Sequence, residues 1–314
     1  MAQPAATPPH RTPRAQEHRM TRPVLVGIDG SDESLDAVAA AAREAADRGC
    51  PLRIVHAFIW PMLHVQLTAS ALGPTEGGLL NQARTFLDEA VARAEATVPG
   101  LETDPELITG EALSVLAAES RDAVLTVVAS RGLGGFSSLL LGSTAVHLAA
   151  HGESPVLVLR GRPDPQGPVV LGLDGSPQAD GAVGFAFATA ARRAAPLVAL
   201  HAWSNWTQPA HRNPGEPMPL VTDLDRLQDD EQRLLAEALA GWQARYPQVQ
   251  VERRLLRSRT RPALIEASRS AQLVVVGARG RGGFAGLLLG STSQALLHHA
   301  DCPVAVIRDV PADS

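Results

Sequence analysis

Two long segments of this chain occur twice in the same order, and this internal repeat constrains the fold more than any other feature. The segment 23–31 reads PVLVGIDGS and returns at 168–176 as PVVLGLDGS, and the glycine-rich segment 130–144 returns at 278–292. A repeat of nearly half the chain is a whole domain, because solenoid units are only about 20–50 residues long. We therefore expect two copies of one fold, and a site in one half predicts a counterpart in the other.

The length and the apolar content fit two domains. The 314 residues, of which 45% are hydrophobic, are enough for two cores of ordinary size. Residues 1–20 are rich in Pro, Ala and Arg without periodicity, so we expect a disordered tail, with Met20 as an alternative start of translation. The predicted organisation is domain one at 21–160, a linker at 161–167 and domain two at 168–310.

Charge and residue usage exclude several classes of function. The net charge of −5 gives no electrostatic reason to expect nucleic acid or an anionic membrane as a partner. The chain has no lysine, since all 28 residues counted as Lys or Arg are arginine, and this excludes a P-loop lysine and Schiff-base chemistry. Cys50 and Cys302 do not correspond in the repeat, so we expect two buried, reduced thiols. With no apolar run of about 18 residues and no secretory signal, we expect a cytoplasmic location.

Each half alternates short apolar strands with helices. In the first half we expect strands at 23–29, 52–58, 102–109, 123–129 and 156–160, and helices at 33–48, 75–98, 112–120 and 143–150. Irregular segments are expected at 59–74 and 203–220, and Ser176-Pro177 predicts a helix start in half two. Apolar strands separated by helices form parallel sheets that are covered on both faces. The predicted fold is therefore α/β, with two tandem, doubly wound, five-stranded parallel sheets of Rossmann-like type.

The final strand of each half is predicted to lie at a sheet edge. Pro155–Arg160 and Pro303–Arg308 occupy this position, and exposed edges readily pair with another strand. We expect the halves to pack through these strands as an intramolecular pseudo-dimer, with a homodimer of two chains as a further possibility.

A glycine-rich loop follows the fourth strand of each half and precedes a helix. In half one Gly132 opens the loop and Gly142-Ser143 begin the helix; Gly280 and Gly290-Ser291 correspond in half two. Glycines let the backbone approach a phosphate, and a helix N-terminus offers unpaired N–H groups and partial positive charge. The alternative is a glycine-rich turn followed by an ordinary serine cap, but two copies with identical internal spacing favour a phosphate cradle.

These residues resemble the nucleotide-binding signature of the universal stress protein family. Gly277-x-x-Gly280, nine residues and Gly290-Ser291 match that signature, and with the first-strand motif and His201-Ala202 they are similar to the tandem, two-domain members found in actinobacteria. The resemblance covers about residues 22–160 and 167–309. It implies a fold of the adenine nucleotide alpha hydrolase type, with ATP and Mg²⁺ as ligands.

In the ATP-binding branch of that family, the aspartate after the first strand contacts the nucleoside, the residue after the second-strand histidine lies against adenine, and the glycine loop surrounds ribose and phosphates. The resemblance implies these positions in half one: Gly27, Asp29, Ala57, Ala129, Gly132, Gly142, Ser143 and Thr144. In half two it implies Gly172, Asp174, Ala202, Gly277, Gly280, Gly290, Ser291 and Thr292. Ala129 departs from the family pattern, which has glycine there, so a methyl group can crowd the ligand or alter the backbone in half one.

Several of these positions also have a structural interpretation. An aspartate at a strand end, such as Asp29, often forms a local turn or caps the next helix. His56 and His201 lie within apolar strands, where a shared structural role is favoured over catalysis or ligand binding. Arg131 and Arg279 precede the loops and either reach the phosphates or pair with an acidic residue of a neighbouring helix.

The leading functional hypothesis is a nucleotide-binding regulator in the stress response rather than a fast enzyme, because no repeated acidic residue lies beside the loop to activate water. One alternative is a slow Mg²⁺-dependent ATPase or a nucleotidyl-transfer enzyme, with Asp29 and Asp174 helping to hold the metal. Another is a structural member of the family with one or both pockets empty. A phosphoacceptor receiver domain is disfavoured, because it needs a lysine.

Overall fold

The structure, a computed structural model, describes residues 21–59, 72–132, 142–176, 179–203, 224–280 and 288–308. The expected disordered tail at 1–20 and almost all of the expected irregular segment at 203–220 lie outside these residues. In the described part of the chain, no helix has both the length and the apolar character needed to cross a membrane.

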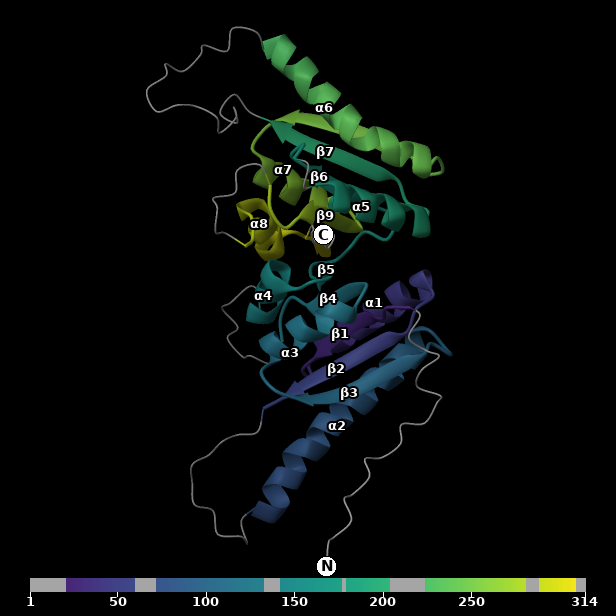
Figure 1. The fold of residues 1–314 in the computed structure, drawn as a ribbon, viewed down its shortest axis with the longest axis vertical. Helices are drawn as coiled ribbons and strands as arrows, with labels where there is room; N and C mark the ends of the chain where they lie inside the picture. Colours follow the sequence, from purple (N-terminus) through teal and green to yellow (C-terminus); the bar gives the residue numbers. More distant parts are fainter. Residues whose placement is uncertain are drawn as a thin grey trace, which may run out of the picture.

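The first half contains five strands and four α-helices in alternation (Figure 1). The strands are β1 (Val24–Ile28), β2 (Leu52–Phe58), β3 (Thr103–Thr109), β4 (Leu125–Ala129) and β5 (Val156–Leu159). The helices are α1 (Asp32–Arg48), α2 (Leu72–Thr97), α3 (Ala112–Glu119) and α4 (Ser143–His151), with a short 3₁₀ turn, η2 (Ser120–Asp122), after α3. The helix expected at 75–98 thus begins earlier, at Leu72, inside the segment expected to be irregular.

The second half repeats this order. Its strands are β6 (Val169–Leu173), β7 (Leu197–Trp203), β8 (Val251–Arg257), β9 (Leu273–Gly277) and β10 (Val304–Ile307). Its helices are α5 (Asp180–Arg192), α6 (Leu224–Arg245), α7 (Thr260–Ala267) and α8 (Ser291–His299), with the 3₁₀ turn η4 (Ser268–Ser270) after α7. The α/β fold predicted from the sequence is confirmed.

The two five-stranded sheets join into one ten-stranded sheet with the order β3-β2-β1-β4-β5-β10-β9-β6-β7-β8. All strand pairs within each half are parallel, whereas β5 and β10 pair antiparallel, with Ala305 opposite Leu157. In Figure 1 the two halves therefore follow one another along the long axis, with β5 near the middle. Because this junction is antiparallel, the strands of the two halves run in opposite directions. The carboxyl ends of the half-one strands therefore lie on the same side of the sheet as the amino ends of the half-two strands.

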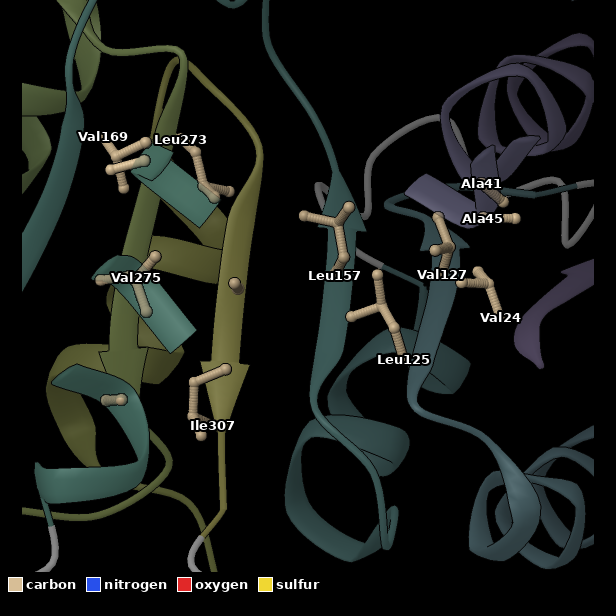
Figure 2. Packing of buried hydrophobic residues seen from close by; sticks show 14 of the residues in the cluster. Val24, Ala41, Ala45, Leu125, Val127, Leu157, Val169, Leu273, Val275 and Ile307 are labelled. Atoms are coloured by element: carbon tan, nitrogen blue, oxygen red, sulfur yellow. The ribbon is translucent and has the colours of Figure 1, made fainter. Parts of the chain in front are cut away.

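Helices cover both faces of the sheet, and each layer is continuous across the junction. Helices α1, α2, α5 and α6 pack on one face, with buried residues such as Ala41, Leu87 and Phe187. Helices α3, α4, α7 and α8 pack on the other face, with buried residues such as Leu116 and Leu296. Figure 2 shows part of the first core, where Leu157 of β5 and Ile307 of β10 lie between the inner strands of the two halves. Each of the two clusters thus contains residues of both halves.

The starts of α1 and α5 differ, although their sequences correspond. Ser31 caps α1, because its Oγ accepts a hydrogen bond from Ser34 N at 3.2 Å. The prediction that Ser176-Pro177 begins the second-half helix was wrong, since α5 begins at Asp180. The carbonyl oxygen of Ser176 accepts a bond from Ala179 N at 3.0 Å, as that of Ser31 does from Ser34 N, and Pro177 lies outside the described residues.

The segment 161–167 runs along half two. Arg162 N donates to Asp301 O at 2.8 Å and Asp164 N donates to Ala271 O at 3.2 Å. Gly161 has a φ of +58°, and a Cβ at this position would lie 2.0 Å from Asp301 O. Glycine is therefore required where this segment leaves β5.

Candidate functional site

The predicted site residues gather at the carboxyl end of the central strands in each half. In half one, β1 lies between β2 and β4, and the chain crosses over in opposite directions on the two sides of β1. Such a switch point leaves a crevice beyond the strand ends, where ligands of doubly wound sheets bind. Asp29 follows β1, Ala57 lies near the end of β2, and Ala129 ends β4. Half two repeats the arrangement around β6 with Asp174, Ala202 and Gly277.

The aspartate after the first strand forms a local turn in both halves. Asp29 Oδ1 accepts hydrogen bonds from Ser31 N at 3.0 Å and from Ser31 Oγ at 2.6 Å. Asp174 Oδ1 accepts from Ser176 N at 2.9 Å. The glycine inside each turn has a positive φ, +86° in half one and +69° in half two, which favours glycine. The local-turn interpretation of both aspartates is thus confirmed for Oδ1.

The same aspartates lie directly against the first glycine of the loop. A Cβ at Gly132 would lie 2.0 Å from Asp29 Oδ2, and a Cβ at Gly280 would lie 2.4 Å from Asp174 Oδ2. Any side chain at these glycines would therefore displace the carboxylate. The structure brings together, in both halves, the two elements that the resemblance assigns to the nucleoside and to the phosphates.

The helix after the loop is tied to the end of the fourth strand. Gly142 N donates to Ser130 O at 2.7 Å, and Gly290 N donates to Ala278 O at 2.6 Å. Helices α4 and α8 begin directly after these glycines, and Ser143 and Ser291 are exposed in their first turns. The N–H groups of a first turn lack partners within the helix and carry partial positive charge, so they can bind an anion. Thr144 and Thr292 follow in the same turns. Residues 133–141 and 281–287 of the intervening loops lie outside the described chain.

The two cradles differ where the fourth strand ends. A Cβ at Gly277 would lie 3.0 Å from Arg279 O, a contact that requires the backbone to yield. Half one carries the methyl group of Ala129 at the corresponding position. Half two also has a bond that the sequence did not predict, because Ser293 Oγ donates to Gly277 O at 2.7 Å. The available signal was a buried serine in α8 where α4 has Ala145.

Gly27 and Gly172 contact the helix layer rather than the loop. A Cβ at Gly27 would lie 2.6 Å from Leu116 Cδ1 of α3, and a Cβ at Gly172 would lie 2.9 Å from Leu264 Cδ1 of α7. These contacts give both glycines a packing role, since a larger residue would push the helix away from the sheet. The first-strand glycine is therefore explained by close helix packing.

The second-strand histidines have the same structural role in both halves, as the sequence predicted. His56 Nδ1 bonds Ile28 O at 2.9 Å and His201 Nδ1 bonds Leu173 O at 2.8 Å, linking the first two strands. Their other neighbours differ. The His56 ring lies edge-on to Phe86 of α2, with centroids 5.7 Å apart, whereas His201 Nε2 lies 2.7 Å from Glu231 Oε2 of α6. The second contact of the histidine is therefore apolar in half one and polar in half two.

Arg131 pairs with the neighbouring helix rather than extending alone. Its Nη2 lies 3.8 Å from Glu33 Oε1 of α1, and both side chains are exposed. This contact favours the acidic-partner interpretation for Arg131 over phosphate binding. Exposed pairs of this kind contribute less than about 1 kcal/mol, so the arginine can still rearrange.

Two further features lie away from these crevices. A cavity of about 640 Å³ lies at the amino ends of β6, β7 and β8, lined by the 164–168 segment and by Glu252 and Arg254, on the edge opposite the half-two crevice. Cys50 and Cys302 are buried without a disulfide, and burial raises the pKa of the Cys302 thiol to about 12, so it stays protonated. Within the described ranges, no group of three or more His, Cys, Asp or Glu residues could hold a metal ion.

Comparison with known proteins gives a consistent result. The model of the universal stress protein family matches residues 20–160 and again residues 167–308. A universal stress protein of Mycolicibacterium smegmatis is 36% identical over 301 residues, covering 91% of this chain and 96% of that protein. One from Mycobacterium tuberculosis is 38% identical over 298 residues, with the same coverage. The crystal structure of a universal stress protein from Archaeoglobus fulgidus covers 93% of this chain and all of its own, with a TM-score of 0.67 at 17% identity.

Proposed function

Because the chain belongs to the universal stress protein family, we propose that it binds ATP with Mg²⁺ in one crevice of each half and acts as a nucleotide-dependent regulator in the stress response. The observation that carries the proposal is the same contact in both halves. The aspartate after the first strand lies against the first loop glycine, beside the start of a helix.

The residues present suit a nucleoside triphosphate. In the proposed complex, Asp29 or Asp174 accepts hydrogen bonds from the nucleoside, and the backbone at Ala57 or Ala202 lies against adenine. The phosphates lie at the helix N-terminus, where the N–H groups and the hydroxyl groups of the first turn donate hydrogen bonds. In half two these hydroxyl groups belong to Ser291 and Thr292. The Mg²⁺ ion would neutralise part of the phosphate charge.

Regulation rather than rapid hydrolysis follows from the chemistry of the chain. A phosphoryl-transfer site places cations and a group that orients water around the terminal phosphate. The chain has no lysine to supply such a cation. A nucleotide that stays bound stabilises the conformation that binds it, and so can act as a signal. We further propose that the halves act as an intramolecular pseudo-dimer through β5 and β10.

Titration calorimetry with Mg²⁺ and ATP tests the proposal. We expect two sites with dissociation constants of about 1 μM, equivalent to about −8 kcal/mol each. Gly142→Val and Gly290→Val should each remove about one site, because a side chain enters the cradle; at Gly290 even a Cβ would lie 3.2 Å from Ala278 O. Gly241→Ala is the matched control, since a Cβ there meets nothing within 4 Å.

The outcomes separate the hypotheses. Absence of heat and of a thermal shift in the unchanged protein would refute nucleotide binding. Steady release of phosphate during the titration would favour the slow ATPase. Loss of all binding with Gly290→Val alone would mean that half one is empty.

The exchange of one methyl group between the halves tests the site more finely. Gly277→Ala should weaken ATP binding in half two by about tenfold, since its Cβ would lie 3.0 Å from Arg279 O and shift the loop. A tenfold change corresponds to about 1.4 kcal/mol. Ala129→Gly should strengthen binding in half one. Calorimetry in the Gly142→Val and Gly290→Val backgrounds assigns each effect to one half, and equal affinities in all variants would contradict the prediction.

A further inference from the structure

The last strand of each half ends in an arginine that bonds to a helix of the other half. Arg160 follows β5, and its guanidinium donates to the carbonyl oxygens of Ala300 and Leu297, with Leu296 O at 3.3 Å. These carbonyls belong to the end of α8. Arg308 follows β10 and donates to Ala150 O, near the end of α4. Helix C-termini have unpaired carbonyls and partial negative charge, so a guanidinium is a suitable partner for them.

The helices held in this way are the two whose first turns form the proposed cradles. Helices α4 and α8 have nine residues each, so each is a rod about 13 Å long. The arginine holds one end of the rod and the nucleotide would bind at the other. Figure 1 shows α4 and α8 near each other on the same side of the sheet, close to β5.

The residue before each arginine accepts a hydrogen bond from the start of the glycine-rich loop of its own half. Leu159 O accepts from Ser130 N at 2.9 Å, and Ser130 O accepts from Gly142 N. In half two, Ile307 O accepts from Ala278 N at 2.7 Å, and Ala278 O accepts from Gly290 N. The bonds close a circuit that runs through α4, Arg308, α8 and Arg160 and returns to the start of the half-one loop.

Burial makes these contacts specific. Both arginines are only partly exposed, and burial lowers the pKa of each guanidinium below its ordinary value. Their donors have thus lost water, and a donor without water needs a protein acceptor. If the helix moves, the arginine has to move with it, and so does the strand end to which the arginine belongs.

We infer that the two nucleotide crevices are coupled and that Arg160 and Arg308 are the positioning residues that couple them. The inference rests on the proposed function. A nucleotide in half one fixes the start of α4 and the turn at Ser130, which fixes Arg160 and the end of α8. The second cradle is then already ordered, so the second nucleotide binds more tightly. We expect occupation of either crevice to tighten binding in the other about fivefold, within the usual range of coupling.

Hydrogen exchange tests the link without any ligand. Arg160→Met should speed exchange at the Gly290 amide and in the first turn of α8, at the opposite end of the helix from the change. Arg308→Met should act in the same way on Gly142 and α4. Arg162→Met is the matched control, because Arg162 is exposed and uses only its backbone N–H in the bond to Asp301 O. An effect confined to the C-terminal turn of α8 would overturn the link.

Calorimetry with Mg²⁺ and ATP then tests the coupling. Arg160→Met and Arg308→Met should make the two steps independent. Arg160→Lys keeps the charge but loses the planar fork that places Nε and Nη1 on separate carbonyls, so it should keep part of the fivefold effect. This variant also guards against misfolding in the methionine variants. Two independent steps in the unchanged protein would overturn the coupling. If ATP does not bind although the exchange effect is present, the proposed function fails and the link between the cradles stands.

Discussion

Replacement of Phe187 by alanine is expected to lower the free energy of unfolding of half two by about 4 kcal/mol. Phe187 lies in α5 with none of its surface exposed. Its ring stacks on Trp242 of α6 and on Tyr246, the residue after that helix, with centroids 6.5 Å and 6.0 Å away. Truncation of a fully buried phenylalanine removes its transfer free energy and leaves a cavity, which together amount to about 3–5 kcal/mol. The loss of the stacked aromatic pairs places this change in the upper half of that range.

Urea denaturation monitored by tryptophan fluorescence measures the effect. Leu79→Ala is a suitable control, since Leu79 is 41% exposed on α2 and its removal should change stability by less than about 0.5 kcal/mol. Because the hydrophobic cluster on each face of the sheet spans both halves, we expect a single transition in the unchanged protein. A loss of less than about 1 kcal/mol for Phe187→Ala would show that α5 and α6 are not held together through this residue.

The fold was largely predictable because the strands are apolar throughout and because the repeat gave each element a second copy. The expected strand at 23–29 and the observed Val24–Ile28 differ only at the ends. The start of α5 was missed, because Ser-Pro satisfies the local rules for a helix start in many contexts.

The site was predictable only at positions where the same glycine or aspartate occurs in both copies of the repeat. The loop glycines and the strand-end aspartates stand out in both copies, and the structure places them in contact. The roles of Arg160, Arg308 and Ser293 could not be predicted, because they depend on contacts formed by tertiary structure. Arg160 bonds a carbonyl 140 residues away in the chain, and no periodicity encodes such a distance.

The two halves have the same backbone arrangement around the crevice but differ in several side chains next to it. Half one has Ala129, Ala145 and Phe86 where half two has Gly277, Ser293 and Glu231. The half-two crevice is therefore more polar, and it has one more bond between its helix and its strand. Under the proposed function, these differences are expected to give the two sites different affinities around the micromolar range.

A buried carboxylate links the two halves on the face of the sheet that α1 and α5 cover, opposite the face with α4 and α8. Glu44 of α1 is 5% exposed, and it pairs with Arg48 of the same helix and with Arg193 at the end of α5, at 2.6 Å. Arg193 also donates to Gln272 Oε1 at 3.0 Å, and Gln272 Nε2 donates to Gly167 O at 2.8 Å. The network thus joins half one, half two and the segment between them.

Replacement of Glu44 by alanine is expected to destabilise the protein by about 3 kcal/mol at pH 7. Removal of one partner from a buried ion pair leaves the other charges uncompensated, which costs about 3–5 kcal/mol. Arg48 and Arg193 are 12% and 24% exposed, so water can partly replace the carboxylate and the lower end of the range applies. Denaturant unfolding measures the difference, with Asp47→Ala, an exposed carboxylate of the same helix, as the control.

The pH dependence of this difference identifies its cause. Burial raises the pKa of Glu44, but the guanidinium groups of Arg48 and Arg193 outweigh burial and hold it below its ordinary value. A carboxyl group with a lowered pKa in the folded state contributes its stability above the unfolded value, about 4.3. The contribution is lost as the pH falls through the lower, folded value. The difference between the unchanged protein and Glu44→Ala should therefore be constant from pH 8 to about pH 5 and shrink below about pH 4. A difference that stays the same at low pH would attribute the loss to packing rather than to the ion pair, and the halves would then be held together by the core and by β5 and β10 alone.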